Sequence, residues 1–185
     1  LMNRVNNYKT DVALYSGFNS KNASRTEFNL DLIPAPERLF RIGVVASDYG
    51  RTPFDETETT TTTGSTSSTT NVREVNKTDY RFNVQIGKRL NHFVFRAGLI
   101  ESKGGFGVDY LLPNNGFRAT FETFDFDQDL GPFVRLATEV RLWSVMYAKL
   151  AGEDLASKDN NQSYTISAGL RFNDEDLASL IGILA

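Results

Sequence analysis

The sequence predicts an all-β fold: one up-and-down antiparallel β-barrel of the outer-membrane type, with about ten strands and a short C-terminal helix. Three observations predict it. Apolar and polar residues alternate along most of the chain, as in strands with two different faces. Most alternating segments have about the ~9–11 residues that a tilted strand uses to cross a bilayer. The connections between the segments are sorted by length.

The alternation defines the strands in chain order. It is clearest at residues 80–87 (YRFNVQIG), and residues 164–172 (YTISAGLRF) repeat it near the end of the chain. The same pattern predicts strands near 9–17, 24–33, 39–48, 77–90, 93–101, 105–112, 117–126, 132–141, 144–152 and 163–173. A barrel of such strands has a mean hydropathy close to that of a soluble protein. No run of residues approaches the ~20 consecutive apolar residues of a membrane helix.

The connections predict a barrel with two different ends. Every second connection of a meander lies at the same end, and the short ones alternate with the longer ones. With an even number of strands both termini lie at the short-turn end, as in outer-membrane barrels with short periplasmic turns. The short connections are 34–37, 91–92, 113–116 and the neighbourhood of Trp143, and the longer ones include 49–76, 127–131 and 153–162.

Two segments depart from the strand pattern. Residues 55–71 are polar, rich in threonine and of low complexity, and two interpretations stay open: a disordered loop, or two strands that continue beyond the membrane. After Phe172 the sequence NDED precedes Leu177, Leu180 and Leu184, which predicts a capped helix with one apolar face. The predicted organisation is therefore a barrel domain over 1–173, with a Thr-rich loop at 49–76, and an amphipathic helix or tail over 174–185.

The two faces of the strands differ in chemistry. The apolar face, predicted to face lipid, includes Phe82, Val84, Ile86, Phe93, Phe95, Leu99, Val108, Phe121, Leu136, Ile166 and Leu170. The other face, predicted to form a charge network in the lumen, includes Arg41, Arg81, Arg96, Asp109, Arg118, Glu122, Arg135, Glu139, Arg141 and Arg171. This face uses arginine with almost no lysine, which suits bidentate carboxylate pairing in a confined interior.

The opposite assignment is a soluble lipid carrier, with an apolar lumen and charges in water. Lys149 is then easier to place, because on a lipid face it has to extend toward the interface. Tyr80, Trp143, Tyr147 and Tyr164 are candidates for interfacial aromatic girdles.

Composition argues against several other functions. The net charge of −3 gives no basic surface for nucleic acid, and the absence of cysteine excludes thiolate chemistry. The only histidine, His92, has no evident nucleophile beside it, so we expect no enzyme and no catalytic residue. Residues 125–131 (DFDQDLG) match the start of a calcium loop imperfectly, so neither a metal site nor a cofactor is predicted.

The chain begins LMNR, with no apolar secretory segment before it, and we expect it to be a piece of a longer protein. Three stretches resemble the C-terminal region of MCE (mammalian cell entry, MlaD-type) lipid-transport proteins: RAGLIESKGGFGVDY (96–110), FETFDF (121–126) and AGLRFNDEDLASLIG (168–182). The resemblance implies phospholipid trafficking between two membranes, an upstream MCE domain, a homo-hexamer and a partner ATPase.

Together these expectations give a functional hypothesis. The chain is a non-enzymatic module of the bacterial outer membrane, with its termini facing the periplasm, that contacts membrane lipids and anchors or terminates a lipid tunnel. The alternatives are a soluble periplasmic lipid-binding barrel with an apolar lumen, and a small outer-membrane pore.

Overall fold

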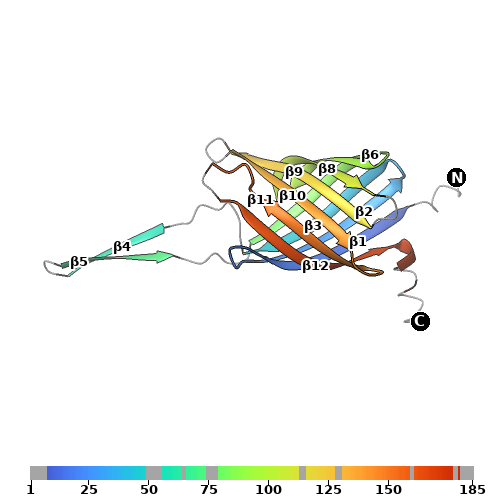
Figure 1. Cartoon of the computed structure of the whole chain (residues 1–185). Coiled ribbons are helices and arrows are strands. Elements are labelled where there is room, and N and C mark those ends of the chain that lie inside the picture. Colours follow the sequence, from blue (N-terminus) through green and yellow to red (C-terminus); the bar gives the residue numbers. More distant parts are fainter. Residues whose placement is uncertain are drawn as a thin grey trace.

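The computed structural model describes residues 8–48, 56–63, 66–73, 79–112, 116–127, 131–158, 161–176 and 179. Within these ranges the chain forms a closed antiparallel barrel of ten strands and a separate two-stranded sheet (Figure 1). The strands are β1 (Lys9–Asn19), β2 (Ser24–Ala35), β3 (Arg38–Ser47), β4 (Glu56–Thr63), β5 (Thr66–Arg73), β6 (Asp79–Leu90), β7 (Phe93–Ile100), β8 (Lys103–Leu111), β9 (Phe117–Asp127), β10 (Gly131–Arg141), β11 (Met146–Glu153) and β12 (Ser163–Asn173).

The barrel is an up-and-down meander. Each strand pairs with its neighbour in the chain, except that β3 pairs with β6, and β1 pairs with β12 to close the sheet. Closure removes the unpaired strand edges that an open sheet would expose. The predicted fold class is confirmed, and each of the ten predicted strands coincides with an observed barrel strand to within about two residues.

The Thr-rich segment contains the two strands that leave the barrel. β4 and β5 pair from Glu56 with Arg73 to Thr63 with Thr66, and the ribbon extends away from one end of the barrel (Figure 1). Of the two interpretations left open by the sequence, the structure favours two strands over a disordered loop. We call this end of the barrel the hairpin end.

The two ends differ less in loop length than the sequence predicted. The short-turn end carries the start of β1, the end of β12 and the connections 36–37, 91–92, 112–116 and 142–145 (Figure 1). At the hairpin end only 48–78 and 154–162 are long, whereas 20–23, 101–102 and 128–130 are as short as the turns opposite. The 101–102 turn is tight because Glu101 and Ser102 both have positive φ, 48° and 65°, a conformation that follows the twist of the flanking strands.

A short helix follows β12, as predicted. The Asn173 side chain accepts a hydrogen bond from the Asp176 N–H at 2.9 Å, and the Asp176 carboxylate accepts one from the Asn173 N–H at 3.1 Å. This reciprocal pair is a capping box. The Thr10 N–H also donates to the Asp174 carboxylate, so the start of the helix is attached to β1. The predicted apolar face at Leu177, Leu180 and Leu184 lies outside the described residues.

The seam between the first and last strands depends on close approach at a glycine. A Cβ added to Gly169 in β12 would lie 2.4 Å from the Leu14 carbonyl oxygen and 2.4 Å from the Tyr15 ring. Backbone atoms cannot retreat from such a contact without opening the β1–β12 pairing. By contrast, a Cβ added to Gly104 meets nothing within 4 Å.

We therefore expect Gly169→Ala to lower the free energy of unfolding by about 1–3 kcal/mol, the range of overpacked sites. The matched control Gly104→Ala should change it by less than about 0.5 kcal/mol. Urea unfolding of the refolded barrel, followed by heat-modifiable gel mobility, measures both. Equal effects of the two substitutions would show that the seam is not tightly packed at Gly169.

Candidate functional site

The strand alternation turns one set of side chains into the lumen, and this set is charged. Among the described residues, the lumen holds basic and acidic side chains in similar numbers. The basic ones are Arg25, Arg41, Arg81, Arg96, Arg118, Arg135, Lys149 and Arg171, and the acidic ones are Asp11, Glu27, Asp31, Glu101, Asp109, Glu122, Glu139 and Glu153. Buried charges are tolerated only when they are paired and hydrogen-bonded, so similar numbers of each sign are what a closed interior requires.

Toward the short-turn end, two arginines hold carboxylates in fork geometry. Arg41 donates to Asp31 through Nε at 2.7 Å and through a terminal nitrogen at 2.6 Å. Arg171 donates to Asp11 at 2.6 Å and to Glu139 at 3.2 Å. The Tyr15 hydroxyl also donates to Glu139, at 3.1 Å. These pairs connect β1, β2, β3, β10 and β12 across the lumen.

Arg96, on β7, organises the side of the lumen next to β8 and β9. It donates to both oxygens of Asp109, at 2.9 and 2.7 Å, to Glu122 at 3.0 Å, and to the Gln85 amide oxygen. Space for the guanidinium comes from Gly107, where an added Cβ would lie 3.1 Å from an Arg96 nitrogen. A side chain at position 107 would press against the arginine on the neighbouring strand.

At the hairpin end, Glu101 lies at the centre of what we call the Glu101 cluster, formed with Arg25, Arg81 and Arg135. Its carboxylate accepts from Arg25 at 2.6 Å, from Arg81 at 2.9 Å and from Arg135. Burial alone would raise the pKa of Glu101, but the charges of Arg135 and Arg25 outweigh it and hold the pKa well below its usual range.

The same cluster explains the turn that carries it. The Glu101 N–H donates to the Asn83 side chain at 2.8 Å, while its carboxylate extends into the lumen. A glutamate with positive φ is unusual. Here the three arginine contacts compensate for a backbone conformation that glycine or asparagine adopts more readily.

An apolar group closes the lumen beside the Glu101 cluster. The Phe124 and Phe133 rings stack with centroids 4.6 Å apart and pack with Ile100. The Arg135 guanidinium lies over both rings, at 5.2 and 5.4 Å from their centroids. Stacked rings under a paired arginine leave little room for an aqueous path at this end.

The free space at the centre of the lumen is polar. A cavity of about 40 Å³, part of it open to solvent, is lined among others by Glu27, Asn29, Arg41, Gln85 and Glu139. Such walls suit water and small ions and not an acyl chain. The described residues include no group of three or more His, Cys, Asp or Glu side chains placed to hold a metal ion.

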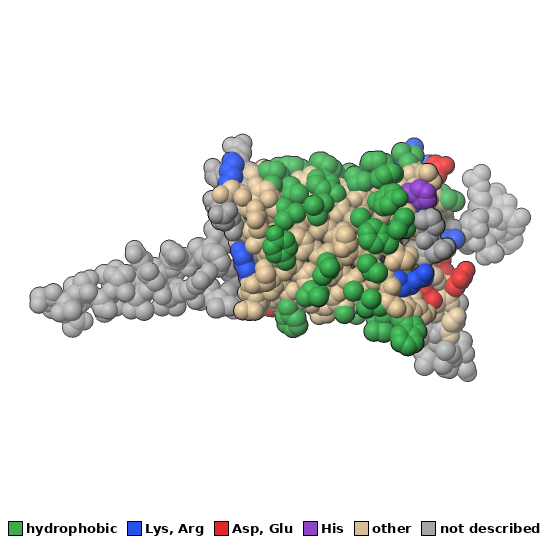
Figure 2. Space-filling view, in the orientation of Figure 1, with side chains coloured by type: hydrophobic (Ala, Val, Ile, Leu, Met, Phe, Trp, Pro, Cys, Tyr) green, Lys and Arg blue, Asp and Glu red, His purple; other side chains and the backbone are tan. Residues whose placement is uncertain are grey.

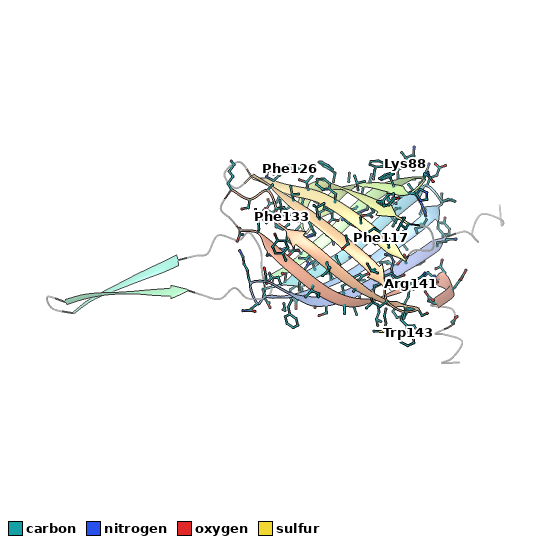
Figure 3. All side chains as sticks on the ribbon, viewed as in Figure 1. Lys88, Phe117, Phe126, Phe133, Arg141 and Trp143 are labelled. Atoms are coloured by element: carbon teal, nitrogen blue, oxygen red, sulfur yellow. The ribbon has the colours of Figure 1, made fainter. Side chains whose placement is uncertain are left out.

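The outer wall is apolar. Each of the ten barrel strands exposes at least one large apolar side chain, and in the view of Figure 2 the Lys, Arg, Asp and Glu side chains gather at the two ends of the barrel. Of the residues predicted to face lipid, Val108 is half-buried and the others are exposed: Phe82, Val84, Ile86, Phe93, Phe95, Leu99, Phe121, Leu136, Ile166 and Leu170. Phe126 and Trp143 lie on this wall at opposite ends of the barrel (Figure 3).

The structure also places the predicted lumen residues. Arg41, Arg96, Asp109, Glu122, Arg135 and Glu139 are buried, and Arg81, Arg118 and Arg171 are partly buried. The prediction that Arg141 belongs to the lumen network was wrong. Arg141 is the last residue of β10 and lies exposed at the short-turn end, where the lumen opens (Figure 3). Alternation alone cannot show where along a strand the interior ends.

Two further placements differ from expectation. Lys149 faces the lumen, where it pairs with Glu27 and lies 5.4 Å from the Tyr15 ring centroid, so it needs no route to the interface. Tyr147 is buried and does not belong to an aromatic girdle. Both errors arise in 144–152, where small apolar residues on both faces leave the inward register ambiguous.

The predicted network omitted Arg25, Glu101 and Glu153. For Arg25 the sequence did offer a signal, because it alternates with Glu27, Asn29 and Asp31 on the polar face of β2. Glu101 is in a turn and Glu153 is the last residue of β11, so no periodicity marks them as inward-facing.

Arg135 provides the sharpest test of the lumen network, because it pairs with Glu101, Glu122 and Glu153. We expect Arg135→Met to lower the free energy of unfolding by about 3–5 kcal/mol, since it leaves buried carboxylates unpaired. The matched control Arg141→Met, on the same strand, should cost less than about 0.5 kcal/mol. Urea titration of both variants gives the comparison, and similar losses would contradict a structural role for the lumen pairs.

Two comparisons with known proteins give no information about function. No curated protein matches the chain. One solved structure, from work titled "De novo design of transmembrane beta-barrels", is 10% identical and covers 89% of this chain and 95% of that chain, with a TM-score of 0.39. A likeness at that level supports no functional argument. No helix among the described residues is long and apolar enough to cross a membrane.

The family comparison corrects the resemblance suggested by the sequence. The predicted relationship to MCE proteins was wrong, because the matching family is a different one. The tunnel, the upstream MCE domain and the hexamer lose their basis with it. The stretch 96–110 misled because its glycines and charges serve barrel geometry: Gly98 has a φ of 145°, and Gly107 makes room for Arg96. A model described as a lipocalin-like domain matches residues 10–179, and the chain therefore belongs to the family of lipocalin-like domains.

Proposed function

We propose that this domain is a non-enzymatic membrane barrel, whose outer wall contacts lipid and whose lumen is closed. The observation that carries the proposal is the distribution of side chains between the two faces of one closed sheet. Balanced charges lie inside and large apolar side chains lie outside, on every strand of the barrel. Soluble monomers rarely expose a contiguous apolar patch above a few hundred Å².

The dimensions support the same proposal. The barrel strands have 8 to 12 residues, and strands of about 9–11 residues tilted near 45° match an apolar band about 25 Å tall. Exposed apolar side chains continue along whole strands, as at Tyr80, Phe82, Val84 and Ile86 of β6. The Ser16 and Thr26 hydroxyls on the outer wall hydrogen-bond each other at 3.1 Å, which reduces the cost of placing them in lipid.

The soluble-carrier alternative has little support from the lumen. A carrier of acyl chains needs an apolar interior, whereas this interior holds paired arginines and carboxylates. Membership of a lipocalin-like family describes the kind of barrel and does not by itself supply a ligand. We place the domain in the outer membrane with both termini on the periplasmic side, because closed barrels of this kind are typical of that membrane.

The proposal makes a depth-dependent prediction along β6. Val84, which is 52% exposed, lies near the middle of the strand, and Tyr80, which is 66% exposed, lies at its hairpin end. In lipid, Val84→Arg should cost about 2–4 kcal/mol and Tyr80→Arg about 0–1 kcal/mol. Folding of the urea-unfolded chain into phospholipid vesicles, followed by heat-modifiable gel mobility, measures both.

A soluble barrel gives a different result, because water surrounds both positions equally. Small and equal effects of the two substitutions, together with a monodisperse wild-type domain in detergent-free buffer, would refute the membrane proposal. Val84→Ala serves as the control for losing the apolar side chain without adding a charge.

The closed lumen distinguishes this domain from a pore. We expect the wild-type barrel in a planar lipid bilayer to carry no stepwise ion current, because the Glu101 cluster and the Phe124–Phe133 stack fill the hairpin end. A porin recorded in the same bilayers is the positive control. Reproducible single-channel steps from the wild-type domain would favour the pore alternative.

A further inference from the structure

The short-turn end of the lumen contains a second cavity, which we call the short-turn mouth. Its volume is about 80 Å³, and part of it is open to solvent. Its walls are lined by Asp11, Asp31, Ile33, Pro36, Arg38, Leu39, Arg41, Arg89, Val94, Asp109, Leu111, Arg118 and Arg171. Arginines outnumber carboxylates in this lining, in contrast to the balance of the lumen as a whole.

Each of the three carboxylates that line the mouth already forms an ion pair with an arginine. Asp31 is held by Arg41, Asp11 by Arg171, and Asp109 by Arg96 and by the Thr120 hydroxyl. The other three arginines of the lining, Arg38, Arg89 and Arg118, form no ion pair with any described residue. The mouth therefore has more arginines than carboxylates, and three of these arginines have no ion-pair partner among the described residues.

Arg118 is the most informative of the three. It lines both the central cavity and the mouth, and its Nε is buried without a hydrogen-bond partner. A buried charged donor that lacks an acceptor is costly, and such groups are usually satisfied by a bound anion or water. Arg38 and Arg89 lie exposed at the rim of the same cavity, and the Arg89 Nε donates to the Asn91 carbonyl oxygen at 3.1 Å. An acceptor in the mouth would therefore meet several donors.

The mouth also has an apolar side. Leu39, Val94 and Leu111 pack together, with Ile33 against them, and all four line the cavity. A small hydrated anion needs no such surface, whereas an amphiphile places its charged group on arginine and its first carbons on leucine and valine. The cavity is too small for a whole lipid, so the remainder of such a molecule would extend out of the opening.

We propose that the short-turn mouth binds a phosphate group, held by Arg38, Arg89 and Arg118, with any attached carbon chain against Leu39, Val94 and Leu111. Arginine suits this ligand because its planar fork donates two parallel hydrogen bonds to a phosphate. The sources of such a group are a phospholipid headgroup and free phosphate. This site goes beyond the proposed membrane role, because it belongs to the lumen and not to the lipid-facing wall.

The experiment is a set of calorimetric titrations of the refolded barrel in a neutral maltoside detergent at low salt. The probes are dihexanoyl phosphatidic acid, inorganic phosphate and dihexanoylglycerol, which has the same chains without the phosphate. We expect saturable binding of phosphatidic acid and none of dihexanoylglycerol. Inorganic phosphate that binds as tightly as phosphatidic acid identifies free phosphate as the ligand, and much weaker binding identifies the amphiphile.

Variants test the assignment of residues. Arg118→Gln should weaken phosphatidic acid binding about tenfold or more, the loss expected for one charge-assisted hydrogen bond. The double variant Arg38→Gln/Arg89→Gln should weaken it at least as much. Its residues are exposed, so it still tests the site if Arg118→Gln fails to fold. The matched control is Arg141→Gln, which removes an exposed arginine at the same end that does not line the cavity.

The proposal would be overturned by the absence of saturable binding to both phosphate probes, or by equal affinities of the wild type, the double variant and Arg141→Gln. Dihexanoylglycerol binding as tightly as phosphatidic acid would show an apolar site without phosphate recognition, and would overturn it as well. Failure of the membrane proposal is distinguishable, since these titrations require no bilayer.

Discussion

The structure depends on the pairing of charges inside a narrow, closed sheet. A ten-stranded barrel has an interior that its own side chains must fill, and here arginines, one lysine and carboxylates fill much of it beside a few apolar and uncharged polar side chains. Removing such groups from water costs several kcal/mol each unless every charge finds a partner with good geometry. The pairs therefore connect distant parts of the chain: Arg171 in β12 reaches Asp11 in β1, and Arg135 in β10 reaches Glu101 after β7.

Other features of the fold are consequences of this filling. Glycine at position 107 leaves space for the Arg96 guanidinium, and the tight turn at Glu101 keeps a positive φ because its carboxylate meets three arginines. The Arg135 guanidinium packs over the rings of Phe124 and Phe133. On the same strands the large apolar side chains point outward, so the charged interior and the apolar outer wall are two sides of one alternating pattern.

The two ends of the lumen are not equivalent. At the hairpin end the arginines converge on Glu101, and stacked rings fill the space beside them. At the short-turn end the carboxylates are paired below the rim, and Arg38, Arg89 and Arg118 are left over around an apolar wall. The start of β1 and the end of β12 also lie at this second end (Figure 1).

The sequence by itself determined the strands and, for most residues, whether the side chain faces the lumen or the outside. Alternation with a period of two residues can be read within one strand, without knowing which strands pair. It placed Arg96 and Arg135 together on one face and Val84 and Ile86 on the other. Tertiary structure alone decided which charges meet, that Glu101 turns inward from a loop, that Lys149 lies inside and that Arg141 lies beyond the lumen. These outcomes depend on strand register and on the closure of β1 with β12, which are set by contacts between residues far apart in the chain.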